Sequence, residues 1–257
     1  MTFTPGITSA ATRGLVFAIA EQTLFVVHEP AVALPIDDVH DGDLYLGELD
    51  GRPCFARVHE GPPTTAPMAL RQLFGVLSDD EFAIAGRALG LTAWDTDHRH
   101  CGRCGAPTVR SAHERVRTCT SCGFSAFPRL SPAVIMMVER DGRGLLARNA
   151  RRNMPFFSTL AGFVEVGETL EHAVAREVRE EAGVEITDIR YFGSQPWPFT
   201  GSLMIGFTAR WVSGEIVADP AEITDAGWFA PDALPMLPPP LSIARELIDD
   251  FVARARR

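Results

Sequence analysis

The apolar residues of the first 60 positions fall in short runs separated by Gly, Pro and Asp. The runs "LVFAIA", "TLFVV", "DLYLGEL" and "PCFARV" have the length and flanking turn residues of strands in a small antiparallel sheet. Residues 69–95 instead show helical spacing in two consecutive stretches, and Ser78 with the acids after it suits the start of the second. The first stretch places four apolar residues on one face: Leu70, Leu73, Phe74 and Leu77.

The pattern changes after residue 130, where strands begin to alternate with helices. Buried strands are predicted in "AVIMMVE", "GRGLLAR", "RYFGSQPWPF" and "SLMIGFTARW", and helices over 170–182 and 242–256. No internal sequence repeat is apparent. The chain is therefore expected to be an α+β protein of three parts: a β-rich domain with two helices over 1–96, a cysteine-containing module over 97–129, and an α/β domain over 130–257.

The predicted helix 170–182 has clear boundary signals. Thr169 is suited to cap its N-terminus, and Gly183 is suited to the left-handed position after its last turn. Three apolar residues at helical spacing form the stripe that faces the core: Leu170, Val174 and Val178.

Three carboxylates gather beside that stripe. Glu177 and Glu181 are one turn apart, and Glu180 lies about 60° around the helix from Glu177. Such close acids repel one another, and Mg²⁺ or Mn²⁺ would relieve the repulsion because both prefer carboxylate oxygen. The spacing alone is equally compatible with a solvated face.

Four of the five cysteines form two Cys-x-x-Cys pairs. A glycine follows each pair, so the backbone can turn and direct N–H groups at the sulfurs. Two such loops close a tetrahedron around one structural Zn²⁺ with no open position, whereas two disulfides or an unmetallated loop are the alternatives. The expected ligands are Cys101, Cys104, Cys119 and Cys122.

Charge and composition narrow the classes of function. The net charge of −9 argues against general adhesion to nucleic acid, although six arginines and only Glu114 lie between Arg99 and Arg129. All 24 basic residues are arginines, which excludes lysine Schiff-base catalysis and a Walker-type phosphate loop. Apolar segment 14–27 is interrupted by Glu21 and Gln22, and no run approaches the roughly 20 residues that span a bilayer. We expect a cytoplasmic protein with no membrane partner.

Residues 162–184 match the pattern G-x5-E-x7-R-E-U-x-E-E-x-G-U, in which U is aliphatic, at every fixed position. This pattern is the Nudix box, so the chain resembles the Nudix hydrolases, which cleave a nucleoside diphosphate linked to another moiety. The resemblance implies an α/β/α sandwich with a mixed sheet for the C-terminal domain. The fixed positions are Gly162, Glu168, Arg176, Glu177, Val178, Glu180, Glu181, Gly183 and Val184.

The same resemblance implies roles for these residues. Glu180 either binds metal or activates water, and Arg176 with Glu168 holds the loop and the helix together. Mg²⁺ or Mn²⁺ is the implied catalytic ion, with more than one ion per site. The implied metal ligands are the carbonyl of Ala161 and the carboxylates of Glu177, Glu180, Glu181 and Glu222.

"SQPWPFTGS" at 194–202, "LPMLPPP" at 234–240 and the cysteine module resemble the NADH pyrophosphatase branch, which also removes NAD caps from RNA. The aromatic rings of Phe163, Trp197 and Phe199 suit the walls of a site for flat rings, whereas taken alone "QPWPF" would be a loop-packing corner. The implied substrate-binding residues are Gln195, Pro196, Trp197, Pro198, Phe199, Thr200, Gly201, Ser202, Phe127, Phe163, Ala244 and Arg71. Phe127 and Thr200 depart from the branch, which usually has Tyr and Pro there; this affects preference among dinucleotides.

The expected reaction is hydrolysis of the pyrophosphate of NADH or NAD⁺ to AMP and nicotinamide mononucleotide, together with NAD-cap removal from RNA. The branch tends to form homodimers with a shared pocket, which implies a homodimer here. The alternatives are a Nudix hydrolase that prefers ADP-ribose or other dinucleotides, and a zinc-ribbon nucleic-acid binder with a vestigial Nudix domain.

Overall fold

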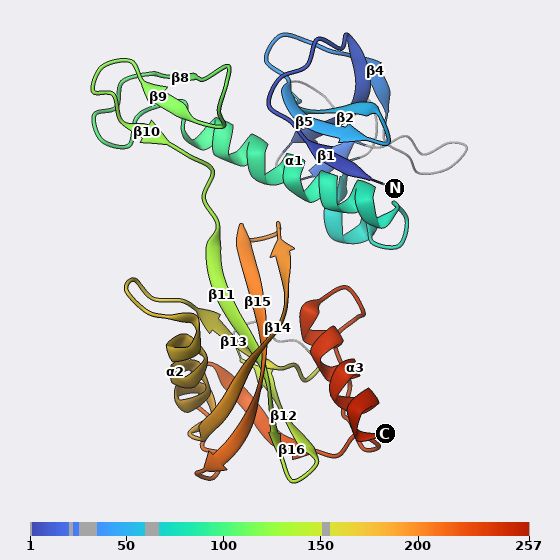
Figure 1. Ribbon diagram of the computed structural model, residues 1–257, viewed down its shortest axis with the longest axis vertical. Helices are drawn as coiled ribbons and strands as arrows, with labels where there is room; N and C mark the ends of the chain where they lie inside the picture. The colour runs from blue at the N-terminus through green and yellow to red at the C-terminus, as the bar shows by residue number, and fades with distance from the viewer. Residues whose placement is uncertain (1, 21–22, 26–34, 60–66, 151–154, 257) are drawn as a thin grey trace. The chain divides into compact units, whose positions relative to one another are not determined.

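The computed structural model describes residues 2–20, 23–25, 35–59, 67–150 and 155–256. It divides into two compact units (Figure 1). Unit 1 comprises Met1–Arg129 together with Pro198–Gly201, and unit 2 comprises Leu130–Trp197 and Ser202–Arg257. The predicted α+β class is confirmed. Among the described residues, no helix has the length and apolar character needed to cross a membrane.

Unit 2 is a mixed sheet between two helices. The strands run in the order β14-β15-β11-β12-β16, with β13 added beside β11, and β11 and β15 are parallel while the other pairs are antiparallel. The elements are β11 (Ser131–Arg140), β12 (Arg143–Asn149), β13 (Leu160–Phe163), α2 (Leu170–Ala182), β14 (Glu185–Trp197), β15 (Ser202–Ser213), β16 (Ile223–Phe229) and α3 (Ile243–Ala255).

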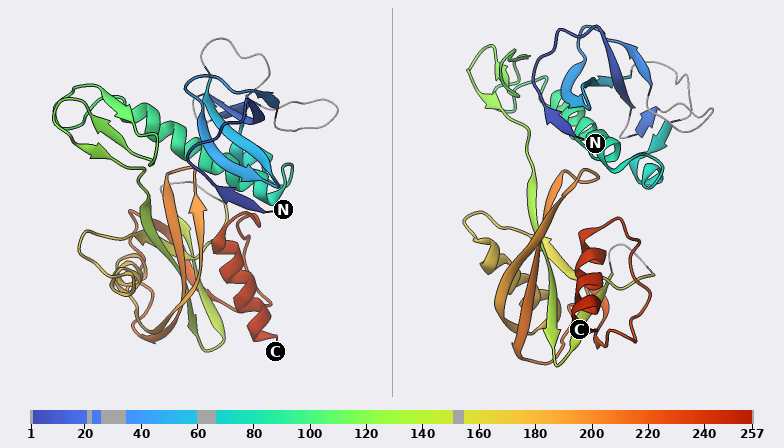
Figure 2. Two further views of the ribbon diagram at one scale, coloured as in Figure 1. Left: turned by 45° about the horizontal axis from the view of Figure 1, so that its top comes forward. Right: turned by 45° about the vertical axis from the view of Figure 1, so that its right-hand side comes forward.

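Successive side chains of β11 point alternately to the two faces of the sheet and pack in two separate hydrophobic cores. Val134 and Met136 face the cluster that includes α2, whereas Ile135 and Met137 face the cluster that includes α3. The two helices therefore lie on opposite faces of the sheet, as Figures 1 and 2 show. A continuous apolar run is what a strand buried on both faces requires.

Unit 1 contains a second sheet, in the order β1-β5-β6-β2-β3-β7 with β4 beside β2, and a small three-stranded sheet, β10-β9-β8. The "TLFVV" strand is described only to Phe25. The elements are β1 (Phe3–Pro5), β2 (Arg13–Ala20), β3 (Thr23–Phe25), β4 (Ile36–Asp38), β5 (Leu44–Leu49), β6 (Arg52–Val58), β7 (Pro67–Ala69), η1 (Leu70–Leu73), α1 (Asp79–Asp97), β8 (Thr108–Arg110), β9 (Arg117–Cys119) and β10 (Ser125–Ala126).

The prediction of two helices before residue 97 was half wrong. The first is a single 3₁₀ turn, η1, because Phe74 takes an extended conformation (ψ 127°) and Gly75 a positive φ of 72°. Phe74 is consequently exposed, although Leu70, Leu73 and Leu77 are buried as expected. Ser78 then begins α1 with a capping box that it shares with Glu81.

The two large sheets repeat one topology, which the sequence did not reveal. Strands β5-β6-β2-β3-β7 correspond in order to β14-β15-β11-β12-β16, with a parallel pair at the same place, β2–β6 and β11–β15. β4 pairs with β2 as β13 pairs with β11, and α1 follows the last strand as α3 does. The absence of an internal repeat thus holds for the sequence and is wrong for the fold.

The two copies differ in one helix. Unit 2 has α2 between β13 and β14, whereas in unit 1 only residues 39–43 connect β4 to β5. Leu15 and Phe17 pack in the core with α1, so Val16 and Ala18 point to the opposite face by alternation. That face borders a cleft of about 840 Å³. Unit 1 therefore retains the frame of unit 2 without its carboxylate-bearing helix.

A buried ion pair joins α1 to the small sheet. Arg117 on β9 donates to the Asp95 carboxylate at 2.5 Å and to the Thr108 hydroxyl and carbonyl. Both charged side chains are almost fully buried, and Arg110 Nε lies 3.5 Å from the same carboxylate oxygen. Removing one partner leaves the other charge buried and uncompensated.

We expect Arg117→Met to lower the free energy of unfolding by about 3 kcal/mol, because Arg110 compensates Asp95 only in part. Arg13→Gln is the control: its ion pair with Asp38 is exposed, and its loss should change stability by less than about 1 kcal/mol. Urea denaturation followed by circular dichroism measures both. Equal midpoints for Arg117→Met and the wild type would contradict the expectation.

Candidate active site and metal centre

Helix α2 forms as its sequence predicts. The Thr169 hydroxyl accepts the His172 N–H at 3.2 Å, and Gly183 ends the helix with a φ of 73°. Val174 and Val178 are fully buried, and Leu170 packs at the edge of the same cluster. The carboxylate-bearing face is therefore fixed relative to the sheet.

Strand β13 places Gly162 directly against the side chain of Glu177. An added Cβ at Gly162 would lie 1.8 Å from Cδ of Glu177, far closer than two non-bonded carbon atoms can approach without displacement. Only glycine permits the strand to pass so close to this side chain. The carboxyl group of Glu177 is thereby held at the sheet surface, with 8% of the residue exposed.

Glu181 is the most deeply buried acid of the site, at 5% exposure. Its Oε2 is shielded from solvent and has no hydrogen-bond partner among the described residues, and the backbone N–H of Ala161 helps to stabilise the negative charge. Burial, followed by the negative charges of Glu177 and Glu222, raises the pKa of Glu181 to about 8. Burial likewise raises the pKa of Glu177.

Glu177 is paired with Arg176, whereas Glu181 forms no ion pair with a basic side chain of the described residues. A buried carboxylate without compensation is unfavourable by several kcal/mol, and a divalent ion with oxygen ligands removes the deficit. Glu177, Glu180 and Glu222 are near enough for their charges to act on Glu181, and carboxylate oxygens are the ligands that Mg²⁺ and Mn²⁺ prefer. The role of these acids and of the Ala161 carbonyl as metal ligands stays a prediction.

Arg176 links the loop between β13 and α2 to the helix itself. Its guanidinium makes two 2.9 Å bonds to the Glu168 carboxylate and a third to the Phe163 carbonyl. The same group donates to Glu177 at 2.7 Å and to Glu180 at 2.9 Å. Hydrogen bonds from Arg176 lower the pKa of Glu168 to about 2, so the ion pair between Arg176 and Glu168 persists near neutral pH. The Glu180 side chain is 59% exposed, which leaves it accessible to solvent.

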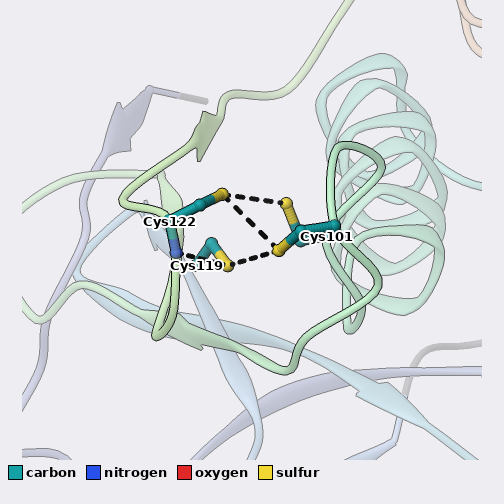
Figure 3. Close-up of side chains that lie close together, drawn as sticks. Cys101, Cys119 and Cys122 are labelled. Carbon is teal, nitrogen blue, oxygen red and sulfur yellow. Dashed lines mark hydrogen bonds between the residues drawn. The ribbon is translucent and has the colours of Figure 1, made fainter.

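The four expected zinc ligands converge, as Figure 3 shows for three of them by label. Their Sγ atoms are 3.7 Å apart for Cys101–Cys122, 3.5 Å for Cys104–Cys119 and 3.6 Å for Cys104–Cys122. A tetrahedral Zn²⁺ with bonds of 2.3 Å requires edges of about 3.8 Å. All the cysteines are free thiols, so the disulfide alternative is wrong.

Backbone N–H groups support this cluster as the sequence predicted. Arg103 donates to Cys101, and Ser121 and Cys122 donate to Cys119, each at 3.4 Å. The hydrogen bonds from Cys122 and Ser121 lower the pKa of the Cys119 thiol to about 6, which favours the thiolate that zinc binds. A Zn²⁺ ion here would hold the two loops together and leave no open position.

The expected substrate residues fall in both units. Phe163, 57% exposed, and Ala244, buried, belong to unit 2 with 195–197 and Ser202. Phe127, 54% exposed, belongs to unit 1 with Arg71 and 198–201.

Within unit 1 the structure brings two of these residues together. Phe199 packs against the hydrophobic core, and the Arg71 guanidinium carbon lies 4.1 Å from the centre of its ring. This cation–π contact orients both side chains.

Gln195 has a structural task that sequence reasoning missed. Its amide oxygen accepts the N–H of Ile243, the first residue of α3, and its amide nitrogen donates to the Leu241 carbonyl at 3.0 Å. Ser242 makes no side-chain cap, so Gln195 supplies the missing bond at the helix start. Its amide is consequently committed within unit 2.

Comparison with known proteins agrees with this architecture. The sequence profile of the NUDIX domain matches residues 128–251, the NADH pyrophosphatase zinc ribbon domain matches 97–124, and the NADH pyrophosphatase-like rudimentary NUDIX domain matches 12–94. The last match is independent support for the duplicated topology.

Curated relatives match along most of the chain. The NAD-capped RNA hydrolase NudC of Deinococcus radiodurans is 45% identical over 82% of this chain and 78% of its own length. The protein of the same name from Pseudomonas aeruginosa is 47% identical over 81% and 76%. A Nudix hydrolase structure from Nitrosomonas europaea covers 60% of this chain and 90% of its own, with a TM-score of 0.52 and 19% identity, and so supports the fold alone.

A mixed sheet between two helices, carrying the complete box, defines a Nudix hydrolase domain. The chain belongs to the Nudix hydrolase family, in the branch that contains the NudC proteins.

Gly162→Ala tests the close packing of strand and carboxylate. The new Cβ must displace Glu177, so we expect Mn²⁺ affinity to fall by about tenfold or more, the loss of roughly one ligand interaction, while circular dichroism stays unchanged. Gly193→Ala is the control, since its Cβ would meet nothing within 4 Å. Electron paramagnetic resonance titration of Mn²⁺ measures the affinity. Wild-type affinity in Gly162→Ala would refute the steric argument.

The raised pKa of Glu181 predicts a pH dependence. Folding favours its protonated form, so its contribution to stability without divalent ions is present below pH 4.5 and is lost as pH rises to about 8. We expect the Tm of the wild type without divalent ions to fall over that window relative to Glu181→Gln, and added Mn²⁺ to restore it at pH 8. Glu171→Gln, an exposed change on the same helix, should follow the wild type. Parallel pH profiles for the wild type and Glu181→Gln would contradict this.

Proposed function

We propose that this protein hydrolyses the pyrophosphate of NADH and NAD⁺ to AMP and nicotinamide mononucleotide, and that it removes NAD caps from RNA. The support is the activity for which two relatives are named, which are 45% and 47% identical to this protein over most of the chain, together with the complete Nudix box. The observation that carries the chemistry is the buried carboxylate of Glu181, which forms no ion pair among the described residues and lies near Glu177 and Glu222.

That arrangement suits attack on a phosphoric anhydride. Divalent ions, Mg²⁺ or Mn²⁺ and more than one per site, would neutralise charge on the phosphates and lower the pKa of a bound water. Glu177 and Glu181 hold the ligand oxygens at the sheet surface, and Glu180 or Glu222 accepts the proton of the attacking water. Glu180 suits that role because it is exposed to solvent yet held at 2.9 Å by Arg176.

Substrate recognition is proposed for the exposed rings of Phe163 and Phe127 and for segment 195–202, because flat nicotinamide and adenine rings favour aromatic contacts. Gln195 contributes by fixing the start of α3, next to Ala244, rather than by a free amide. A homodimer in the cytoplasm is proposed from the resemblance to the branch.

An RNA strand would meet a smaller basic surface than the sequence suggested. Arg115 and Arg117 are bonded inside unit 1, whereas Arg99, Arg103 and Arg129 are exposed. We propose that these three exposed arginines contact the phosphates of a capped RNA, which makes binding salt-dependent.

Glu180→Gln tests the reaction. The substitution keeps the size of an exposed side chain, so the fold should persist while kcat for NADH falls by about a hundredfold or more, the usual effect of losing a general base. Glu171→Gln lies on the same helix and should retain wild-type kcat. Chromatography of AMP and reduced nicotinamide mononucleotide measures turnover. Wild-type kcat in Glu180→Gln would remove Glu180 from the mechanism.

A substrate panel separates the remaining functions. Comparing kcat/KM for NADH, NAD⁺, ADP-ribose and NAD-capped RNA, with Mg²⁺ and with Mn²⁺, should favour the nicotinamide substrates. A clear preference for ADP-ribose would place the chain with a different Nudix specificity, and no hydrolysis of any substrate would favour a vestigial domain.

A further inference from the structure

The tip of the hairpin between β14 and β15 belongs to unit 1, although both strands belong to unit 2. β14 ends at Trp197 and β15 begins at Ser202, and these two residues pair across the hairpin, so residues 198–201 form its tip. The tip is part of segment 195–202, the proposed substrate-recognition segment. Its contacts within unit 1 therefore bear on how that segment is held.

Pro198 packs against a glycine of α1. A Cβ added to Gly86 would lie 2.8 Å from Cγ and 3.2 Å from Cβ of Pro198. Gly86 is buried in the interior of α1, where a glycine weakens the helix relative to alanine. The missing side chain leaves the space that the proline ring occupies.

Phe199 is held beside this contact. Its ring packs at the edge of the hydrophobic core of unit 1, and the guanidinium carbon of Arg71 on η1 lies 4.1 Å from the ring centre. Leu70, the preceding residue of η1, is buried in the same core. Two elements of unit 1, η1 and α1, thus hold the tip.

The other end of the recognition segment is held in unit 2. The side-chain amide of Gln195 bonds with the Leu241 carbonyl and the Ile243 N–H at the start of α3. Trp197 lies between the two anchors, next to Pro198. Its position therefore depends on both ends of the segment.

Prolines make this segment stiff. Pro196 and Pro198 fix their own φ angles, and the residue before each proline is confined to extended conformations. A flexible side chain could rotate away from a new Cβ at Gly86, but the ring of Pro198 is bonded to its own backbone nitrogen. Displacement of the ring consequently moves the peptide bond to Trp197.

We propose that Gly86 is a positioning residue for substrate recognition. By admitting the ring of Pro198, it sets the position of Trp197 in the substrate site. Unit 1, which lacks a counterpart of α2, then has a part in recognition through its hold on the tip. This inference rests on the proposed role of segment 195–202 in substrate binding.

Gly86→Ala tests the role kinetically. The new Cβ must displace Pro198, and the weakened ring contact should raise KM for NADH by about threefold or more, while kcat stays within about twofold of the wild type. Affinity for Mn²⁺ should not change, because α2 lies in unit 2. Gly90→Ala is the matched control: it lies on the same helix, its Cβ would meet no described atom within 4 Å, and it should keep wild-type KM.

Pro198→Ala provides the rescue. It removes Cγ and leaves only the 3.2 Å approach to Cβ, so Gly86→Ala should change KM little further in that background. The same fold-increase in both backgrounds would overturn the inference, as would equal KM values for Gly86→Ala and Gly90→Ala. A loss of Mn²⁺ affinity in Gly86→Ala would also overturn it, because the change would then extend beyond the recognition segment.

Thermal unfolding tests the contact without any substrate. Gly86→Ala should have a lower Tm than Gly90→Ala, and the two should be nearly equal once Pro198→Ala is present. If Gly86→Ala unfolds too readily for kinetics, Pro198→Ala must restore the folded protein, and failure to do so would refute the contact. Because Tm requires no turnover, failure of this inference and failure of the proposed hydrolysis are distinguishable.

Discussion

The catalytic unit is organised around the burial of two carboxylates at neighbouring turns of one helix. Glu177 and Glu181 lie against a sheet with almost no exposure, and only Glu177 is paired with an arginine among the described residues, so the charge of Glu181 is unfavourable until a cation compensates it. Three features of the unit hold these carboxylates in place. They are the capped ends of α2, Gly162, which lets β13 approach the helix, and Arg176, which links the preceding loop to α2.

The frame beneath that helix occurs twice in the chain. In both copies a parallel strand pair is flanked by antiparallel strands, and a terminal helix covers one face. In unit 2 the second face of the sheet is covered by α2, which carries the Nudix-box glutamates. In unit 1 only residues 39–43 connect the corresponding strands, and the second face borders a cleft. The same sheet therefore serves once as a platform for reactive groups and once as a support for the zinc module.

Features set by a few adjacent residues could be predicted from the sequence, whereas contacts between residues far apart in the chain could not. The ends of α2 follow from Thr169 and Gly183, and the sulfur cluster follows from cysteine spacing, because both depend on a few adjacent residues. The 3₁₀ turn at 70–73 was missed because apolar spacing is alike in both helix types. The roles of Gln195 and of the paired strands depend on residues far along the chain, which no periodicity records. Glu222, on the loop before β16, became a candidate only through the family resemblance.

The short link between β4 and β5 has an evolutionary consequence. Point substitutions can change which side chains a segment carries, but residues 39–43 are too few to wind into a helix that spans the face of a sheet. To carry a helix like α2 on this face, the first copy would need an insertion that supplies both helix caps and correctly spaced carboxylates. Substitutions within the present residues can therefore alter this face only through the side chains of its strands and of the short link.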